Sequence, residues 1–314
     1  MKKNISIIGG GLTGLLIAYR LSEADYKVSV YEKNKELGGL VSSFKQGSIY
    51  LEKSYHHIFK GDKNIIQLIN ELDLGSKLKW YTSSIANYMD RRLYPFMSAV
   101  DLLKFSPLKL KDRIRMGGVA LYLQKENRWQ KFEKEKAWKW MKKWGGESAY
   151  LKIWQLLLRG KFHNLYKQVS MAWLWARINT RAKSAKNGGK EELGYLDGGF
   201  YLIIDELVKR IKNKGGRIFL NKEIKRISQL KDSDKIIASI DSNNFAKIVE
   251  REKLDIDYIK KLKSIKYLAY IGVVFKSKQS LSDYYWHNIN DSKSPFLAFI
   301  QHSNLVGKER YGNS

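Results

Sequence analysis

Cysteine is absent from this 314-residue chain, and proline is scarce, with three residues. Without cysteine the chain can form no disulfide framework, no thiol nucleophile and no thiolate metal site. Its five histidines show no ligand spacing such as HExxH, so we expect no metal ion. No apolar run reaches the roughly 18 uninterrupted residues of a membrane-spanning helix. The lysines at positions 2 and 3 precede an apolar stretch that has no small-residue cleavage site. We therefore expect a cytoplasmic protein that is at most peripheral to a membrane.

Charge of one sign dominates, with a formal net charge of +27. Such a charge is common in proteins that bind nucleic acid or a membrane surface. The lysines are spread along the whole chain, however, and no nucleic-acid-binding motif accompanies them, so we expect no nucleic acid partner. Only residues 125–144 interleave lysine with tryptophan in a pattern suited to peripheral membrane contact. A helix that packs these aromatic side chains inward explains the same pattern, and we favour that alternative.

A dense glycine pattern near the start is the most specific feature of the sequence. The apolar run Ile5–Ile8 leads into the spacing GxGxxG, then into a helical pattern, and a second β-rich run ends at Glu32. The glycines of the pattern are Gly9, Gly11 and Gly14. They provide a tight turn, an approach of the backbone to a pyrophosphate, and close contact between helix and strand. The pattern predicts a dinucleotide-binding βαβ unit, with the pyrophosphate at the helix N-terminus and the ribose hydroxyls on Glu32.

A second glycine pair distinguishes FAD from NAD as the expected cofactor. Gly38 and Gly39 follow Glu32 at the spacing ExxxxxGG. Two glycines there allow the backbone to pass close to a ligand that extends beyond its adenylate half. We therefore predict FAD.

The remaining chain has the organisation of an α/β protein of two domains. Helices are expected over 64–72, over most of 98–181 and over 201–214, with breaks at glycines 145–146 and 188–189. A hairpin is expected at 85–96, a capping box at Ser98 and Asp101, and a helix start at Ser106-Pro107. Strands are expected over 217–220, 224–228, 235–240 and 267–275, the last in the substrate domain.

The chain resembles the flavin-dependent amine oxidoreductase superfamily, in its branch of protoporphyrinogen oxidases and phytoene desaturases. Beyond the glycine motifs, the resemblance is carried by segments such as KSYHHIF (53–59), LLRGKF (157–162), SMAWLWARINTR (170–181) and ELGYLDGGF (192–200). It implies a Rossmann-like FAD-binding domain, residues 1–62 and 196–245. It also implies an inserted substrate domain, mostly helical with a β-sheet, of residues 63–195 and 246–314.

The candidate site residues follow from the motifs and from this resemblance. The expected cofactor-binding residues are Gly9, Gly11, Leu12, Thr13, Gly14, Glu32, Lys33, Gly38, Gly39, Leu40 and Ile224, the last approaching the adenine through its backbone as the resemblance implies. Tyr55, His56 and His57 are the catalytic candidates, because the family passes the flavin there and a histidine can assist proton removal near neutral pH. Packing of these aromatic rings at a domain boundary is an equal alternative. The arginines at 159, 177 and 181 suit either an anionic substrate group or a solvated helix face, and we favour the latter.

The expected function is an FAD-dependent oxidoreductase that removes hydride from C–H, C–C or C–N bonds of a hydrophobic or cyclic small molecule. Members of the superfamily end with a Gly-Asp element and a helix that faces the flavin, and this chain lacks that pattern. Two alternatives therefore stay open: a redox-neutral flavoenzyme similar to UDP-galactopyranose mutase, and a truncated, noncatalytic FAD-binding remnant. The substrate, the electron acceptor and the oligomeric state are left open.

Overall fold

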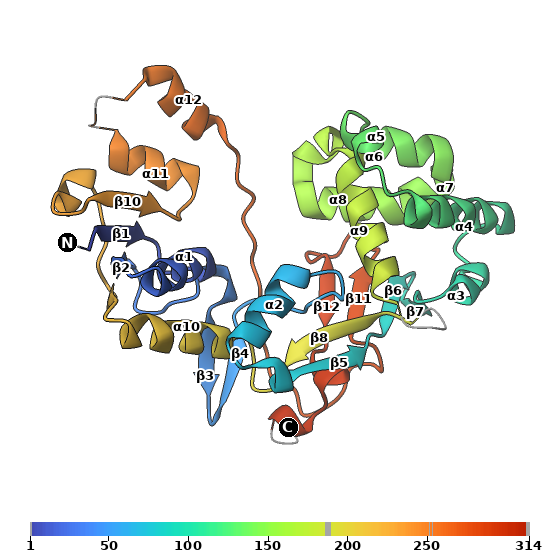
Figure 1. The fold of residues 1–314 in the computed structure, drawn as a ribbon. Coiled ribbons are helices and arrows are strands. Elements are labelled where there is room, and N and C mark those ends of the chain that lie inside the picture. The colour runs from blue at the N-terminus through green and yellow to red at the C-terminus, as the bar shows by residue number, and fades with distance from the viewer. Residues whose placement is uncertain (1, 186–189, 251, 253, 312–314) are drawn as a thin grey trace. The chain divides into compact units, whose positions relative to one another are not determined.

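The computed structural model describes residues 2–185, 190–250, 252 and 254–311. Glycines 188–189, predicted to break the helical region, lie outside the described residues. The chain divides into two compact units (Figure 1). The first unit comprises 1–56, 67–78 and 196–275, and the second comprises 57–66, 79–195 and 276–314.

A parallel sheet forms the centre of the first unit. Its strands, in spatial order, are β10 (Lys235–Ala238), β1 (Asn4–Ile8), β2 (Lys27–Tyr31) and β9 (Arg217–Phe219). Every neighbouring pair is parallel. Helix α1 (Leu12–Glu23) connects β1 to β2, as the glycine motif predicts. The mixed α/β class with a parallel sheet is thereby confirmed.

The sheet is covered on both faces, and its strand sequences reflect this. Ile7 and Val30 are fully buried, and their strands are almost continuously apolar, as strands with two covered faces must be. Helix α10 (Tyr201–Asn213) packs beside α1. Helix α11 (Ser242–Val249) packs Ile248 and Val249 into a core with Ile8. Helix α12 (Ile256–Ser264) packs beside α11.

Residues 67–78 and 246–275 group with this first unit, whereas the resemblance implied that they belong to the substrate domain. Their contacts explain the grouping. Helix α2 (Lys63–Glu71) ends in Glu71, which accepts hydrogen bonds from Tyr19 and Arg20 of α1. The residues of α11 bury their apolar side chains on the sheet. Hairpin β3 (Ser43–Gln46) and β4 (Ile49–Glu52) completes the unit.

The second unit combines a four-stranded sheet with a group of helices. The sheet runs β12 (Ala298–Ile300), β11 (Trp286–Ile289), β6 (Ile85–Met89), β7 (Arg92–Pro95), and β6 is parallel to β11. The predicted hairpin at 85–96 is confirmed by the antiparallel pair β6–β7. Strands β5 (Leu78–Thr82) and β8 (Glu192–Leu196) form a separate two-stranded sheet.

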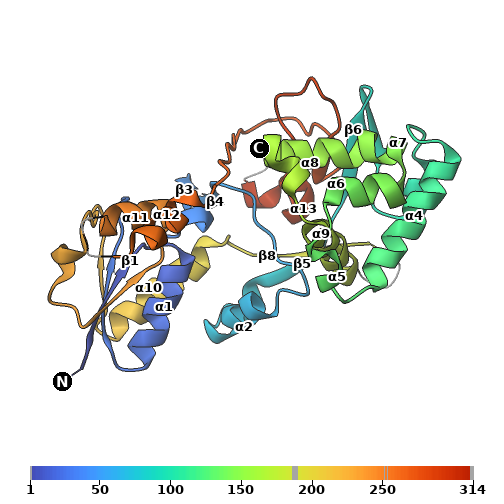
Figure 2. The same ribbon diagram turned by 90° about the horizontal axis from the view of Figure 1, so that it is seen from above.

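The predicted helical region is confirmed between the hairpin and β8 (Figure 2). Its helices are α3 (Ala99–Lys104), α4 (Leu110–Lys125), α5 (Gln130–Glu133), α6 (Ala137–Trp140), α7 (Glu147–Ala149), α8 (Gln155–Phe162) and α9 (Met171–Lys183), with π-helical turns at Met141–Gly145 and Tyr150–Trp154. Ser98 and Asp101 form the predicted capping box of α3. The short helix α13 (Ser303–Val306) follows β12.

The tryptophan-rich segment 125–144 contributes mainly to a hydrophobic core. Phe132 and Met141 are buried, and Trp138 and Trp140 pack against the same cluster. Trp129 and Trp144 are about half exposed. Inward packing therefore accounts for most of these side chains, and peripheral membrane contact stays a prediction. No helix in the described part of the chain is both long and apolar enough to cross a bilayer.

The predicted helix start at Ser106-Pro107 is wrong. Helix α4 begins at Leu110, and Lys109 precedes it without a side-chain cap. Phe105 and Leu108 are almost fully buried, and the Leu108 N–H donates to the Phe105 carbonyl. These two anchors hold Ser106 and Pro107 in a turn instead.

The predicted strand at 224–228 is also wrong. The amides of Lys225 and Arg226 donate to the side-chain oxygen of Gln229, at 2.7 and 3.0 Å, and a 3₁₀ turn follows over Ile227–Leu230. A side chain that satisfies the backbone locally removes the need for a strand partner.

The apolar run 267–275 forms no strand, contrary to the prediction. No residue of the run takes part in a β-bridge, and the run groups with the first unit. Ile271 and Val273 are 90% and 80% exposed. A strand needs a hydrogen-bonding neighbour as well as β propensity, and no described segment pairs with this run.

Candidate functional site

The first glycine loop connects β1 to α1 in the first unit. Gly9 adopts φ +107°, a conformation that favours glycine, and donates its N–H to the Tyr31 carbonyl at 2.9 Å. The Ser239 hydroxyl, at the end of β10, donates to the Gly9 carbonyl at 3.1 Å. The loop is therefore held from both neighbouring strands. Sequence reasoning missed Ser239, whose only signal was a hydroxyl at the end of a predicted strand.

Gly14 and Gly11 have different structural reasons to be glycine. A Cβ atom on Gly14 would lie 2.0 Å from the Gly9 carbonyl oxygen, so Gly14 allows α1 to approach the strand. A Cβ atom on Gly11 would find no atom nearer than the Gly39 Cα at 3.9 Å. The fold itself therefore leaves space at Gly11. Gly11 is the N-cap residue of α1 and has no side chain to cap the helix, so the first-turn amides of Leu12 and Thr13 receive no capping bond from it.

The second glycine loop lies directly against the first. Gly38 donates its N–H to the Gly10 carbonyl at 2.9 Å, and it forms a parallel bridge with Gly11. Its φ of +101° again favours glycine. Leu40, predicted as a cofactor contact, is 90% exposed. The structure thus brings together two glycine segments that are about 27 residues apart in sequence.

Glu32 is buried, with 7% of its surface exposed, and both carboxylate oxygens have partners. Oε2 accepts from the Gly10 N–H at 2.8 Å, and Oε1 accepts from the Asn34 N–H at 2.9 Å and its side-chain amide at 2.7 Å. Lys33 between them is exposed. The carboxylate is thereby fixed in position beside the glycine loop. Sequence analysis missed Asn34 because an asparagine after a strand is typical of an ordinary turn.

Ile224 lies in the same unit, 5% exposed, in the core that contains Ile8. The chain approaches the end of β2 just before it, where the Lys222 N–H donates to the Glu32 carbonyl at 2.8 Å. The side chain of Ile224 is therefore occupied by packing, which leaves its backbone as the group able to face a ligand.

These groups suit a dinucleotide chemically. The space at Gly11 and Gly39 would be filled by any Cβ, and uncapped helix amides adjoin it, which is the donor set that a pyrophosphate requires. A fixed carboxylate at the end of the second strand suits ribose hydroxyls. The individual residue assignments stay predictions.

The catalytic candidates have separate surroundings. The ring of His56 lies in the first unit, where its Nδ1 is 2.7 Å from the Ser54 carbonyl and its centroid is 5.8 Å from that of Phe200. His57 groups with the second unit, where its Nδ1 is 3.3 Å from the Tyr285 hydroxyl. Tyr55 is partly buried. Among these contacts, no residue therefore lies beside the rings of both histidines.

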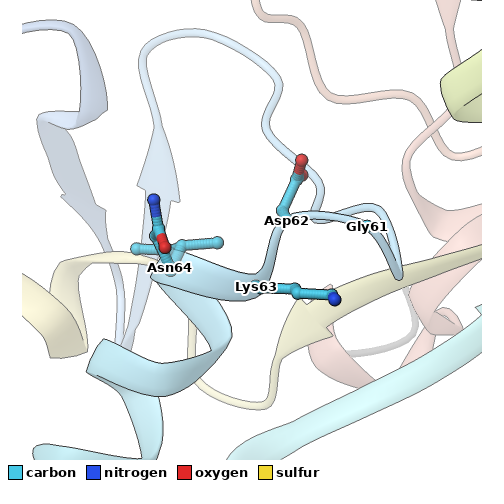
Figure 3. Close-up of a pocket in the computed structure, with 5 residues that line it drawn as sticks. Gly61, Asp62, Lys63 and Asn64 are labelled. Atoms are coloured by element: carbon cyan, nitrogen blue, oxygen red, sulfur yellow. The ribbon is translucent and has the colours of Figure 1, made fainter. Parts of the chain in front are cut away.

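A surface hollow of about 450 Å³ lies at the start of α2, lined by residues 61–65 (Figure 3). The Asp62 carboxylate accepts from the Phe59 N–H at 2.9 Å, and Lys63 points in a different direction. Since no set of reactive groups converges there, we assign it no chemistry.

Curated relatives include two phytoene desaturases and a protoporphyrinogen oxidase. The 15-cis-phytoene desaturase of Synechococcus elongatus is 34% identical over 82 residues, covering 26% of this chain and 17% of that protein. The chloroplastic/chromoplastic 15-cis-phytoene desaturase of Solanum lycopersicum is 26% identical over 347 aligned positions, which cover 98% of this chain and 58% of that protein. Mitochondrial protoporphyrinogen oxidase of Nicotiana tabacum is 26% identical over 117 residues, which cover 36% of this chain and 23% of that protein. The chain thus spans less than two thirds of the length of these relatives.

Solved structures show the same fold. A putative protoporphyrinogen oxidase from Exiguobacterium sp. 255-15 superposes with a TM-score of 0.68 at 16% identity, over 97% of this chain and 74% of that one. Reduced UDP-galactopyranose mutase superposes with a TM-score of 0.67 at 16% identity, over 96% of this chain and 70% of that one. The model of the family described as flavin containing amine oxidoreductase matches residues 12–252. These findings confirm the prediction of FAD as the cofactor, and the chain belongs to the flavin containing amine oxidoreductase family.

Proposed function

We propose that this protein is an FAD-dependent oxidoreductase that removes hydride from a C–H, C–C or C–N bond of a hydrophobic or cyclic substrate. The observation that carries the proposal is the contact between the two glycine loops, at the Gly38–Gly10 hydrogen bond, beside the fixed carboxylate of Glu32. Family membership supports the flavin. The substrate class rests on the named relatives, which include phytoene desaturases and protoporphyrinogen oxidases.

In this proposal the backbone holds the cofactor. The amides of Leu12 and Thr13 donate to the pyrophosphate, and the missing side chains at Gly11 and Gly39 allow its approach. Glu32 accepts from the ribose hydroxyls, and Asn34 and the Gly10 amide keep it in place. FAD, when bound, supplies the hydride acceptor, while the protein supplies binding, orientation and electrostatics.

His56 is the better candidate for the proton acceptor, because its contact sets the tautomer of the ring. A carbonyl oxygen can only accept, so the contact with Ser54 requires a proton on Nδ1 of His56. In the neutral ring Nε2 then carries the lone pair that can take a proton from substrate. His57 faces a hydroxyl, which can donate or accept, so its tautomer is not set by that contact.

Extraction of the purified protein tests the cofactor, and a substrate panel tests the reaction. We expect FAD on chromatography and bleaching of the flavin absorbance under anaerobic conditions with a hydrophobic or cyclic reductant. NAD(P) as the only extracted dinucleotide, without competition by FAD, would contradict the proposal. Redox-neutral isomerisation of UDP-galactopyranose would replace the oxidoreductase with a mutase-like function. Bound flavin that no substrate reduces would favour a noncatalytic FAD-binding protein.

His56→Gln tests the proton acceptor. We expect it to lower the rate of flavin reduction by about 10²-fold or more, the usual contribution of a positioned acid or base. Flavin content should not change, because His56 has no role in the proposed binding of the cofactor. His163→Gln, an exposed histidine of the second unit, is the control. Equal rates for parent and His56→Gln would contradict the assignment.

A further inference from the structure

A serine and a histidine of the second unit form a hydrogen bond where the chain enters β11. The Ser282 Oγ lies 2.5 Å from Nε2 of His287. The other ring nitrogen, Nδ1, lies 3.1 Å from the Phe299 carbonyl oxygen of β12. A carbonyl oxygen can only accept, so Nδ1 carries the proton, and in the neutral ring the Nε2 lone pair accepts from the Ser282 hydroxyl. This sequence of hydroxyl, imidazole and orienting acceptor is the arrangement that activates a serine nucleophile.

His287 is both fixed and kept neutral by its surroundings. Strands β11 and β12 pair His287 with Phe299 in antiparallel register, and the rings of these two residues have centroids 5.0 Å apart. His287 is 3% exposed, and burial lowers its pKa below the ordinary 6.5, against the opposing effect of the Phe299 carbonyl. A neutral imidazole is the form that can take a proton, so His287 suits the role of a base at neutral pH.

Ser282 is held in place by contacts of its own backbone. Its N–H lies 3.3 Å from the side-chain oxygen of Gln301, and its carbonyl accepts from the Asn304 amide at 2.7 Å. Ser282 is half-buried, and the neighbouring Leu281 is 59% exposed. The hydroxyl is therefore positioned against a buried base, in a residue that is partly open to solvent.

A local turn explains only some of the contacts of the Ser282 hydroxyl. The Tyr284 N–H donates to it at 3.0 Å, a short-range contact that serine often makes. Ser277 and Ser294 form the same turn, and their hydroxyls donate to the carbonyl two residues later at 2.9 and 3.0 Å. For Ser282 that carbonyl is 3.4 Å away, and Nε2 of His287 is nearer. Of these three turns in the described chain, only that of Ser282 brings the hydroxyl to a histidine.

We propose that Ser282 is a nucleophile that takes up an acyl group from an activated ester or thioester, with His287 as its general base. The Ser282 oxygen attacks the carbonyl carbon and passes its proton to Nε2. The new Oγ–C bond forms, the bond to the leaving oxygen or sulfur breaks, and the leaving group takes the proton from the imidazolium.

The surroundings of Ser282 also indicate which acyl donors it can use. Its own N–H faces Gln301 and the Tyr284 N–H faces its hydroxyl, so neither is directed at a developing oxyanion. Donors with a good leaving group depend least on such stabilisation, which is why the proposal is limited to activated esters and thioesters. The reaction needs no flavin and does not depend on the proposed redox function.

Labelling of the 314-residue protein with a fluorophosphonate tests the nucleophile. In this reaction an Oγ–P bond forms, fluoride leaves, and His287 takes the proton. We expect peptide mass spectrometry to locate the phosphonyl group on Ser282, and p-nitrophenyl acetate to acetylate the same residue. Protein unfolded in urea should not be labelled there, because the contact with His287 is lost. No label on Ser282 in the native protein, or equal labelling in urea, would overturn the proposal. This comparison needs no variant.

Variants then test the role of the base. His287→Gln should slow the labelling of Ser282 by about 10²-fold or more, the usual contribution of a positioned base. Because His287 is buried, the unfolding temperature is measured first, and rates are compared where both proteins are folded. Ser294→Ala removes a hydroxyl with the same turn and no histidine, so it is the matched control and should not change the rate. Equal labelling rates for parent and folded His287→Gln would overturn the proposal.

Discussion

The two units arrange their polar groups in opposite ways. In the first unit, the candidate cofactor site consists mainly of backbone amides and of glycines that leave space, and its carboxylate, Glu32, accepts three hydrogen bonds from the chain itself. In the second unit, long side chains meet one another, as in the ion pair between Arg181 and Glu191, whose nitrogen–oxygen distance is 3.2 Å. A site made of backbone is most sensitive to added atoms, whereas a site made of side chains is most sensitive to removed charge. Four predictions test this contrast.

Gly14→Ala should have the largest effect. Its Cβ would lie 2.0 Å from the Gly9 carbonyl oxygen, so α1 or the loop must move. We expect a loss of about 3 kcal/mol or more in the free energy of unfolding, at the upper end of overpacking costs. Urea unfolding measures it, and Gly11→Ala, with space for its methyl group, is the control. Equal midpoints for the two variants would show that Gly14 has no packing role.

Glu32→Gln should weaken both the cofactor site and the fold. An amide group places donor hydrogens where the Gly10 and Asn34 groups already donate. We expect flavin affinity to fall by about 1.5–3 kcal/mol, or roughly 10- to 100-fold. A lower unfolding temperature should accompany it, because Glu32 is buried. Glu36→Gln, which removes a carboxylate that pairs with Lys53, is the control and should leave flavin affinity intact.

Gly11→Ala should separate binding from folding. The nearest atom to its Cβ is 3.9 Å away, so the unfolding free energy should stay within the error of measurement. Flavin affinity should fall about tenfold, or about 1.4 kcal/mol, because the methyl group occupies the approach to the pyrophosphate. Gly61→Ala, where nothing lies within 4 Å, is the control. Unchanged flavin affinity would remove Gly11 from the cofactor site.

The smallest expected effect is the pH dependence that His287 gives to the stability of the second unit. Burial lowers the pKa of His287 below its ordinary 6.5, because the charged ring is disfavoured. The folded state therefore gains full stability above about pH 6.5 and loses it as the pH falls below that value, where the unfolded chain binds the proton more readily. His287→Gln should flatten the unfolding temperature over this range, whereas His163→Gln should not. A parent profile that does not fall on acidification would contradict the assignment.

The features that were predicted correctly, in both units, have local signals. The GxGxxG spacing, the capping box and the hairpin each depend on residues a few positions apart, and all appear in the structure. Two predictions failed where neighbouring residues take roles that propensity alone does not show. Buried anchors turn the chain at Ser106, and Gln229 satisfies the amides that a strand would have used.

Prediction from sequence was also incomplete for the candidate cofactor site. Glu32 and the glycines could be found by spacing, but Asn34 and Ser239 act through contacts that no short pattern encodes. For the arginines of α9, the sequence favoured a solvated face, but Arg177 and Arg181 are half-buried and Arg181 pairs with Glu191 at 3.2 Å. The burial of a side chain depends on the tertiary fold, which spacing alone does not show.

The exposed run 267–275 has a consequence for how the protein behaves in solution. Most of its side chains are β-branched or aromatic, and its backbone groups have no strand partner among the described residues, so identical runs on two molecules can pair. The net charge of +27 keeps molecules apart at low ionic strength. Added salt shortens the range of that repulsion to about 10 Å at 0.1 M and leaves the apolar attraction in place. Solubility should therefore decline with added salt, because weaker charge repulsion no longer opposes the pairing of this exposed run.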